Sequence, residues 1–168
     1  IPGCGTTIKH FACNNQEDNR MGSDSVLSER ALREIYLKGF EIAVKNSQPM
    51  SIMTSYNQIN GVHAANSYDI CTKAARDEWG FAGAIMTDWT TTTASTAGVC
   101  TAAGCMRAGN DMVMPGVKAD HDNIRQELKE GTLEPGALQR CICNTVSLAL
   151  QSNQYEEAVS YSSQFDGL

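Results

Sequence analysis

Four groups of polar and aromatic residues each stand at the end of a short apolar stretch of the chain. One group holds Asp88, and a carboxylate in such a place can act as a nucleophile or cap the following helix. Another holds His10, which by its type alone is typical of a hydrogen-bonded structural histidine. The residue types by themselves leave both interpretations open. The four groups are Lys9-His10, Ser55-Tyr56-Asn57, Asp88-Trp89 and Met114-Pro115-Gly116.

The apolar stretches in front of these groups predict four strands, each followed by a polar loop and a segment with helical spacing of apolar residues. Ser25 or Ser28 is expected to cap the first helix, and Asn60-Gly61 is typical of a turn. The predicted strands are Thr7–Ala12, Ser51–Tyr56, Gly83–Trp89 and Asp111–Met114, and the predicted helices are Ser28–Asn46, Tyr68–Trp79, Ala94–Ala108, His121–Glu130 and Pro135–Gln151.

This alternation of strands and helices predicts an α/β fold with parallel strands, since each helix must carry the chain back across one face of the sheet. About four βα units followed by a C-terminal helix are expected. The carboxyl ends of parallel strands meet at one edge, where active sites of such folds are built. We therefore expect the four polar groups on one rim of a single domain, followed by a loosely packed tail over residues 152–168.

The composition narrows the function classes. The chain has 168 residues, of which 42% are hydrophobic and 19% charged, and a net charge of −6. An acidic chain offers no basic footprint for nucleic acid, and its apolar runs are far shorter than the roughly 18 residues that cross a bilayer. The start at Ile1 shows neither an initiator Met nor a signal peptide, so we expect the natural N-terminus to lie elsewhere.

Seven cysteines are too few for a disulfide scaffold and lack the spacing of a metal site. We expect most of them to be small buried hydrophobes, with a disulfide as the less favoured alternative. Tyr36, Phe40 and Trp79 lie on helical stripes and are expected in the core. His63 and His121 belong to no motif and are expected at the surface.

Six short runs of the sequence resemble the glycoside hydrolase family three β-glucosidases and their β-xylosidase relatives. They occur in the order of that family, which makes a chance match implausible. The runs are Lys9–Glu17, Ser28–Leu37, Met53–Asn57, Arg76–Phe81, Thr87–Trp89 and Ala108–Met112.

The resemblance implies a fold and a missing part. The first domain of that family is a TIM (β/α)₈ barrel, and the present chain is similar to the C-terminal half of that barrel over residues 1–168. It omits about half of a barrel and the α/β sandwich domain that usually follows. We expect either self-association through the open sheet edges or pairing with the missing N-terminal half-barrel and sandwich domain.

The resemblance also implies roles for individual residues. Asp88 matches the catalytic nucleophile, and Trp89 matches one wall of the sugar pocket. Lys9 and His10 match the pair that hydrogen-bonds the sugar hydroxyls. Two further matches are Tyr56, beside the nucleophile, and Met53, on the pocket wall.

The activity that follows from this match is retaining hydrolysis of terminal β-D-glucosyl residues through a covalent glycosyl-enzyme. It needs no metal or cofactor. The acid/base Glu of the family has no counterpart here, and the loop carboxylates Glu17, Asp18, Asp24 and Asp69 are weak substitutes. Glu17 and Arg20 are expected instead to form a structural pair that supports the Lys9-His10 loop.

Several alternatives remain open at this stage. The parent protein could be a β-xylosidase, because one hydroxymethyl group separates the two substrates. The chain could be an inactive fragment or scaffold, or part of a relative in which the sandwich domain precedes the barrel. By analogy with the family, a secreted or extracellular location is favoured.

Overall fold

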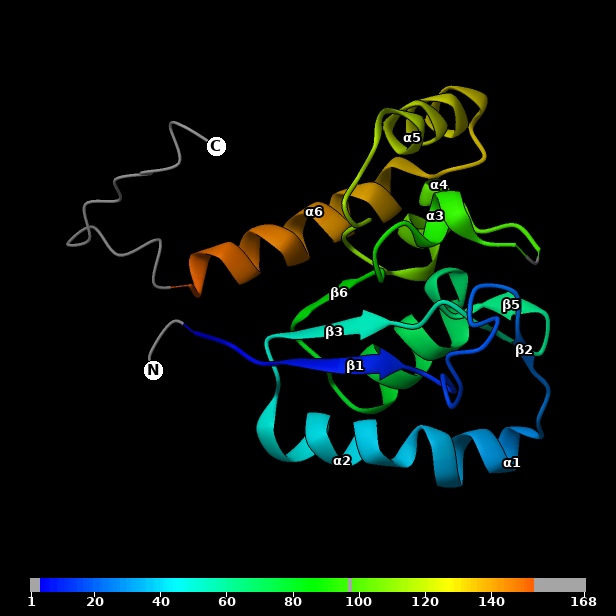
Figure 1. Ribbon diagram of the computed structural model, residues 1–168. Helices are drawn as coiled ribbons and strands as arrows, with labels where there is room; N and C mark the ends of the chain where they lie inside the picture. Colours follow the sequence, from blue (N-terminus) through cyan, green and yellow to red (C-terminus); the bar gives the residue numbers. More distant parts are fainter. Residues whose placement is uncertain (1–3, 97, 153–168) are drawn as a thin grey trace, which may run out of the picture.

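The computed structural model describes residues 4–96 and 98–152. Its centre is a parallel sheet of three strands in the order β1 (Thr7–Phe11), β3 (Ser51–Thr54) and β6 (Ala84–Met86). The order in space follows the order along the chain, as expected from consecutive βα units (Figure 1). The predicted parallel α/β fold is confirmed for these three strands.

The register of the sheet sorts side chains to two faces. Ile8, Ile52 and Ile85 stand side by side in neighbouring strands. All three belong to one apolar cluster, in which Ile52 and Ile85 are fully buried. The opposite face carries Met53 and Met86, which are paired in register and remain partly exposed. One face of the sheet thus holds the core and the other is left partly open.

The first predicted helix is present as three nearly continuous segments. These are α1 (Glu29–Ala31), the π-helical η1 (Leu32–Tyr36) and α2 (Lys38–Ser47). Ser28 caps the helix as predicted, because its side chain accepts a hydrogen bond from the Ala31 backbone N–H at 3.2 Å. Together the segments run along one side of the sheet (Figure 1).

The second helix, η3 (Asp69–Glu78), is also π-helical and packs into the same core. Phe11 joins the two helices to the sheet, since its ring lies 4.9 Å from the ring of Phe40 and 5.9 Å from that of Trp79. Trp79 is buried and Phe40 packs against the cluster, as predicted. The prediction for Tyr36 was wrong, because this residue is 37% exposed.

The third and fourth units differ from the prediction. The expected helix Ala94–Ala108 is divided into α3 (Thr91–Ala94) and α4 (Ala102–Ala108). Thr101 begins the second piece, because its side chain accepts a hydrogen bond from the Gly104 backbone N–H at 2.9 Å. The expected strand Asp111–Met114 is reduced to a single parallel bridge between Met86 and Met112.

A second sheet was not predicted at all. It consists of β2 (Asp24–Ser25), β4 (Gln58–Ile59) and β5 (Val62–His63) in the order β2-β4-β5. The hairpin turns at Asn60 and Gly61, whose φ angles of 50° and 83° lie in the left-handed region that this pair of residues tolerates. The Asn-Gly signal was noted in the sequence, but two-residue strands are too short to show an alternating pattern.

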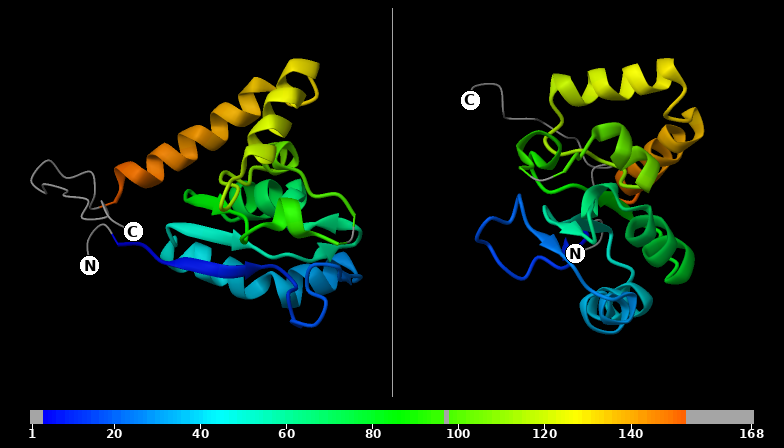
Figure 2. Two further views of the ribbon diagram at one scale, coloured as in Figure 1. Left: turned by 45° about the horizontal axis from the view of Figure 1, so that its top comes forward. Right: turned by 90° about the vertical axis from the view of Figure 1, so that its right-hand side faces the viewer.

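Two long helices complete the described part of the chain. α5 (Lys118–Glu130) and α6 (Pro135–Leu150) follow the bridge at Met112, and a short 3₁₀ turn, η2 (Ala64–Asn66), packs against α4. Figure 2 shows that α6 extends on the side of the sheet away from α2. The apolar residues Ile142, Val146 and Leu150 of α6 are each about half exposed. The predicted tail falls mostly outside the described residues.

Candidate active site

The end of β1 places Lys9 and His10 at the rim of the sheet. Ile8 pairs with Ile52 and Phe11 with Thr54, so β1 has one residue more than its partner across this stretch. Such a bulge breaks the alternation of side chains and re-aims the extra residue. His10 is partly buried, and its Nε2 lies 3.5 Å from Oδ2 of Asp88. Lys9 is exposed beside it.

The end of β6 holds Asp88 at the same rim. The side chain of Asp88 is 14% exposed. Its Oδ1 accepts a hydrogen bond from the backbone N–H of Trp89 at 2.7 Å, and Oδ2 faces His10. The two carboxylate oxygens therefore have different neighbours: the Trp89 N–H orients Oδ1, and the imidazole of His10 lies beside Oδ2.

Tyr56 approaches Asp88 from the segment that follows β3. The ring is buried, and its hydroxyl donates to the backbone carbonyl of Trp89 at 2.8 Å. Burial raises the pKa of Tyr56, and the charge of Asp88 and a hydrogen bond with it raise this pKa further. The phenol is thus held protonated, as a hydrogen-bond donor, next to the carboxylate.

The backbone beneath these residues is tied together by buried amides and hydroxyls. Ser55 Oγ and Asn57 Nδ2 both donate to the carbonyl of Ala12, at 2.8 and 3.1 Å. Thr54 Oγ1 donates to the carbonyl of Met86 at 3.2 Å and accepts from Asn110 Nδ2 at 3.1 Å. The ends of the three strands are therefore fixed relative to each other, and so are the side chains that they carry.

The remaining two predicted residues lie at the edge of this cluster. Met53 is partly exposed and pairs in register with Met86 on the open face of the sheet. The Trp89 side chain is 56% exposed, so its ring faces solvent in this part of the protein. The structure thus brings His10, Tyr56, Asp88 and Trp89 into contact and leaves Lys9 and Met53 beside them.

Three of the four loop carboxylates considered as substitutes for a catalytic acid have other partners. Glu17 binds Arg20 at 2.7 Å, so the pair predicted from the sequence is confirmed. Asp24 accepts from the Gly61 N–H at 3.0 Å, and Asp69 binds Lys73 at 2.6 Å. These three carboxylates serve loops and helices rather than the Asp88 cluster.

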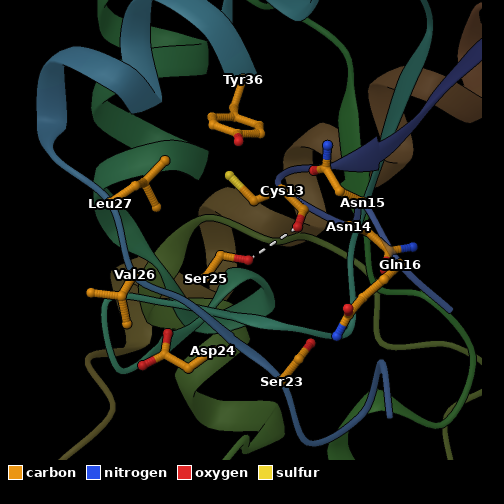
Figure 3. A pocket seen from close by; sticks show the side chains of 10 residues that line it. All are labelled: Cys13, Asn14, Asn15, Gln16, Ser23, Asp24, Ser25, Val26, Leu27 and Tyr36. Carbon is orange, nitrogen blue, oxygen red and sulfur yellow. Dashed lines mark hydrogen bonds between the residues drawn. The ribbon is translucent and has the colours of Figure 1, made fainter. Parts of the chain in front are cut away.

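A hollow beside the loop after β1 lies apart from this cluster. It has a volume of about 340 Å³, and the hydroxyl of Ser25 crosses it to the Cys13 carbonyl at 3.1 Å (Figure 3). None of the residues predicted from the sequence to bind sugar lines it. The lining residues are Cys13, Asn14, Asn15, Gln16, Ser23, Asp24, Ser25, Val26, Leu27 and Tyr36.

In the described ranges, 4–96 and 98–152, no cluster of His, Cys, Asp and Glu side chains could hold a metal ion. No helix in the same ranges is long and apolar enough to cross a membrane. The seven cysteines are all free, and five of them are buried, as expected of small hydrophobes.

Sequence reasoning missed one residue of the site. His63 was expected at the surface, but it is 2% exposed and its Nδ1 lies 3.0 Å from the backbone carbonyl of Tyr56. The Asn60-Gly61 hairpin sets this position, because it pairs His63 with Gln58 and points the exposed Val62 the other way. The sequence pattern gives no signal for this, because alternation in the hairpin would place the apolar pair Ile59 and Val62, rather than His63, on the buried face.

Comparison with known proteins gives a match over most of the chain. The model of the glycosyl hydrolase family 3 N-terminal domain matches residues 3–143. The chain belongs to this family. The resemblance stated from the sequence is confirmed, and a TIM-barrel-like α/β fold is the fold of the matched domain.

The relatives of this family 3 chain include enzymes that are named for different sugar substrates. A β-glucosidase of Ruminococcus albus is 44% identical over 158 residues, which are 90% of this chain and 16% of the relative. An exo-α-(1→6)-L-arabinopyranosidase of Bifidobacterium longum is 43% identical over 87% of this chain and 18% of its own length.

Solved family 3 structures superimpose closely. β-Glucosidase 3B of Thermotoga neapolitana, in complex with α-D-glucose, has a TM-score of 0.83 and 41% identity over 91% of this chain and 22% of its own. A β-glucosidase of Paenibacillus barengoltzii has a TM-score of 0.84 and 42% identity over 96% of this chain and 19% of its own. The chain spans about a fifth of the length of these relatives.

Proposed function

We propose that this chain carries the nucleophile half of a retaining β-glycosidase site, with Asp88 as the nucleophile. The observation that supports this most is the convergence on Asp88 of three groups from three strand ends. His10 lies 3.5 Å away, the Trp89 N–H donates at 2.7 Å, and the Tyr56 phenol lies alongside. Donors arranged around one carboxylate fix its orientation for attack and stabilise its charge.

The proposed reaction also needs an acid/base group, which lies outside this cluster. An oxygen of Asp88 forms a bond to the anomeric carbon while the glycosidic bond breaks, and an acid gives its proton to the leaving oxygen. Water then attacks the same carbon, returns its proton to that group and releases Asp88. Such an acid must stand about 5–5.5 Å from the nucleophile. We propose that it comes from a part of the protein beyond this chain.

The roles of the flanking residues follow from their places. Lys9 and His10 would hydrogen-bond sugar hydroxyls, since both stand at the rim next to Asp88. Trp89 would stack on the sugar ring, and Met53 would close the pocket wall. The exposed indole of Trp89 offers a free aromatic face, which a bound sugar ring would cover.

The proposed substrate is a terminal β-D-glucosyl residue. The relatives named β-glucosidase support it, and the 43% identical arabinopyranosidase supports a pentopyranoside as the second candidate. The same site could serve a β-xyloside. Glucose differs from xylopyranose by one hydroxymethyl group, which a pocket distinguishes only by its shape.

We further propose that the sheet described here is the C-terminal part of a (β/α)₈ barrel. Three adjacent parallel strands and the bridge at Met112 would then be four consecutive barrel positions. Closing the barrel needs further strands at both edges. A missing half-barrel and a sandwich domain would supply them and the acid.

The test is hydrolysis of p-nitrophenyl β-D-glucoside, β-D-xyloside and α-L-arabinopyranoside by this chain and by the intact product of the gene that contains it. Asp88→Ala should lower kcat/KM of the intact product by at least about 10³-fold. A 2-fluoro-glucoside inactivator should add its glycosyl mass to the peptide that contains Asp88.

Two outcomes would overturn the proposal. One is undiminished hydrolysis by Asp88→Asn, and the other is covalent labelling of a different carboxylate. If the isolated chain is active and this activity depends on Asp88, only the proposal that the acid comes from beyond this chain is contradicted. A folded but silent chain beside an active intact product would support it.

A further inference from the structure

Arg20, in the loop between β1 and β2, lies over the ring of Tyr56. The guanidinium carbon of Arg20 lies 4.7 Å from the ring centroid. This is within the roughly 6 Å at which a cation is attracted to an aromatic face. The side chain of Arg20 is only 37% exposed. Arg20 therefore covers one face of a ring whose hydroxyl lies at Asp88.

The same guanidinium is held from its other side by Glu17. Arg20 Nη1 donates to Glu17 Oε2 at 2.7 Å, and Asn14 Nδ2 donates to the other carboxylate oxygen at 3.4 Å. A partly exposed pair three residues apart adds little stability by itself. What the pair does achieve is to fix the plane of the guanidinium above Tyr56.

At its far end the ring of Tyr56 meets the candidate nucleophile. Its hydroxyl donates to the Trp89 carbonyl at 2.8 Å, and the N–H of the same residue donates to Asp88 Oδ1 at 2.7 Å. Burial and Asp88 raise the pKa of Tyr56, whereas the positive charge of Arg20 lowers it. Arg20 thus acts on Tyr56 both by contact and by charge.

We propose that Arg20 is a positioning residue that holds the phenol of Tyr56 against Asp88, with Glu17 as its anchor. This extends the pair predicted from the sequence, since its target is Tyr56 rather than the Lys9-His10 loop. The inference rests on the proposed function, because positioning matters only if Asp88 attacks. A ring that can tilt would release the Trp89 backbone, whose N–H orients Asp88 for the transition state.

The first test does not require hydrolysis. In the chain labelled with ζ-¹³C tyrosine, Tyr56→Phe identifies the Tyr56 resonance, and its titration is followed in wild type, Arg20→Met and Arg20→Lys. Arg20→Met should shift the resonance and raise the phenol pKa, because the cation that lowers it is gone. Arg20→Lys should keep the pKa near that of wild type but still shift the resonance, since an ammonium group has no planar face.

The matched control is Arg30→Met, which removes an 83% exposed arginine paired with Glu34 on a helix. It should leave the Tyr56 resonance and its titration unchanged. An unchanged resonance in Arg20→Met, or full restoration of the wild-type resonance by Arg20→Lys, would overturn the proposal. Circular dichroism of each variant separates these outcomes from unfolding.

The second test uses the intact gene product. Arg20→Met should lower kcat by about 10- to 100-fold with a smaller change in KM, because a displaced donor affects the transition state more than binding. Arg20→Lys should recover only part of the loss. A rise in KM alone would overturn the positioning role. If Asp88→Ala has no effect on the same enzyme, the proposed function fails, while the resonance test still decides the contact between Arg20 and Tyr56.

Discussion

At the scale of single residues, Tyr56 is the centre of the candidate site. Its hydroxyl meets Trp89 and Asp88, its ring face meets Arg20, and its backbone carbonyl meets His63. A side chain with partners on every side has one conformation. The nucleophile is therefore oriented before any substrate binds.

Replacing Tyr56 by Phe removes the hydroxyl and keeps the buried ring. We expect the free energy of unfolding to fall by about 1 kcal/mol for the lost bond to the Trp89 carbonyl. We expect kcat of the intact enzyme to fall more steeply, by about 10- to 100-fold, since the phenol no longer holds the Trp89 backbone whose N–H donates to Asp88. Urea denaturation and steady-state kinetics measure the two effects. A large loss of stability with unchanged kcat would refute this assignment.

The buried thiols make a separate prediction about pH. Burial raises the pKa of Cys71 and of Cys141 to about 12. In the unfolded chain these thiols ionise near pH 9, so above that pH the folded state binds more protons and stability declines as the pH rises. Reduced protein should therefore lose urea stability between pH 8 and pH 10.5, and Cys71→Ala should lose less than wild type over the same range. Cys143→Ala, at an exposed site, should follow wild type.

At the scale of elements, a buried ion pair joins η3, β6 and α6. Oδ2 of Asp111 accepts from Arg76 at 2.5 Å and from the Ile85 backbone N–H at 2.7 Å, and Oδ1 accepts from Asn144 at 2.9 Å. The Asp111 side chain is fully buried and that of Arg76 is 13% exposed. β6, which is followed by Asp88, is thus tied to two helices.

Asp111→Ala should cost about 3–5 kcal/mol of the free energy of unfolding, because it leaves the charge of Arg76 buried without a counter-ion. The matched control is Asp77→Ala, at an exposed position on the same helix as Arg76, which should change stability by less than about 0.5 kcal/mol. Urea denaturation of both variants tests the difference. Equal stabilities would show that the pair does not brace β6.

The elements also show what the sequence could and could not predict. Ser51–Thr54 and Ala84–Met86 are short, apolar and followed by polar groups, and such strands are visible from local pattern alone. The two-residue strands of the β2-β4-β5 sheet are stabilised by contacts between distant segments, so no local pattern indicates them. The helix expected over residues 94–108 failed because the Thr101 cap outweighed an Ala-rich composition.

The candidate site followed the same division. Asp88, His10 and Tyr56 were predicted because motifs carried them. Arg20 was expected to support a loop, and its contact with Tyr56 depends on how that loop folds over a segment 36 residues away. Such a contact belongs to the tertiary structure and leaves no spacing in the sequence.

At the scale of the whole molecule, the described part has unpartnered surfaces on both sides of its sheet. α6 exposes Ile142, Val146 and Leu150, and the first helix exposes Ile35 and Ile42. Figures 1 and 2 place these helices on opposite sides of the sheet. Among the described residues, β1 pairs with β3 alone, so its other edge is open. In a longer protein the remainder of a barrel would cover these surfaces.

In the isolated chain, a second copy is the available partner for those surfaces. We expect sedimentation at about 10–500 μM to show concentration-dependent self-association, because open strand edges and apolar helix faces associate in this range. Ile142→Glu with Val146→Glu should shift the chain toward monomer, since each introduces a charge into an apolar contact. Val99→Glu changes a residue that is 79% exposed on a loop and should leave association unchanged. A monomer at every concentration would show that these faces do not bind one another.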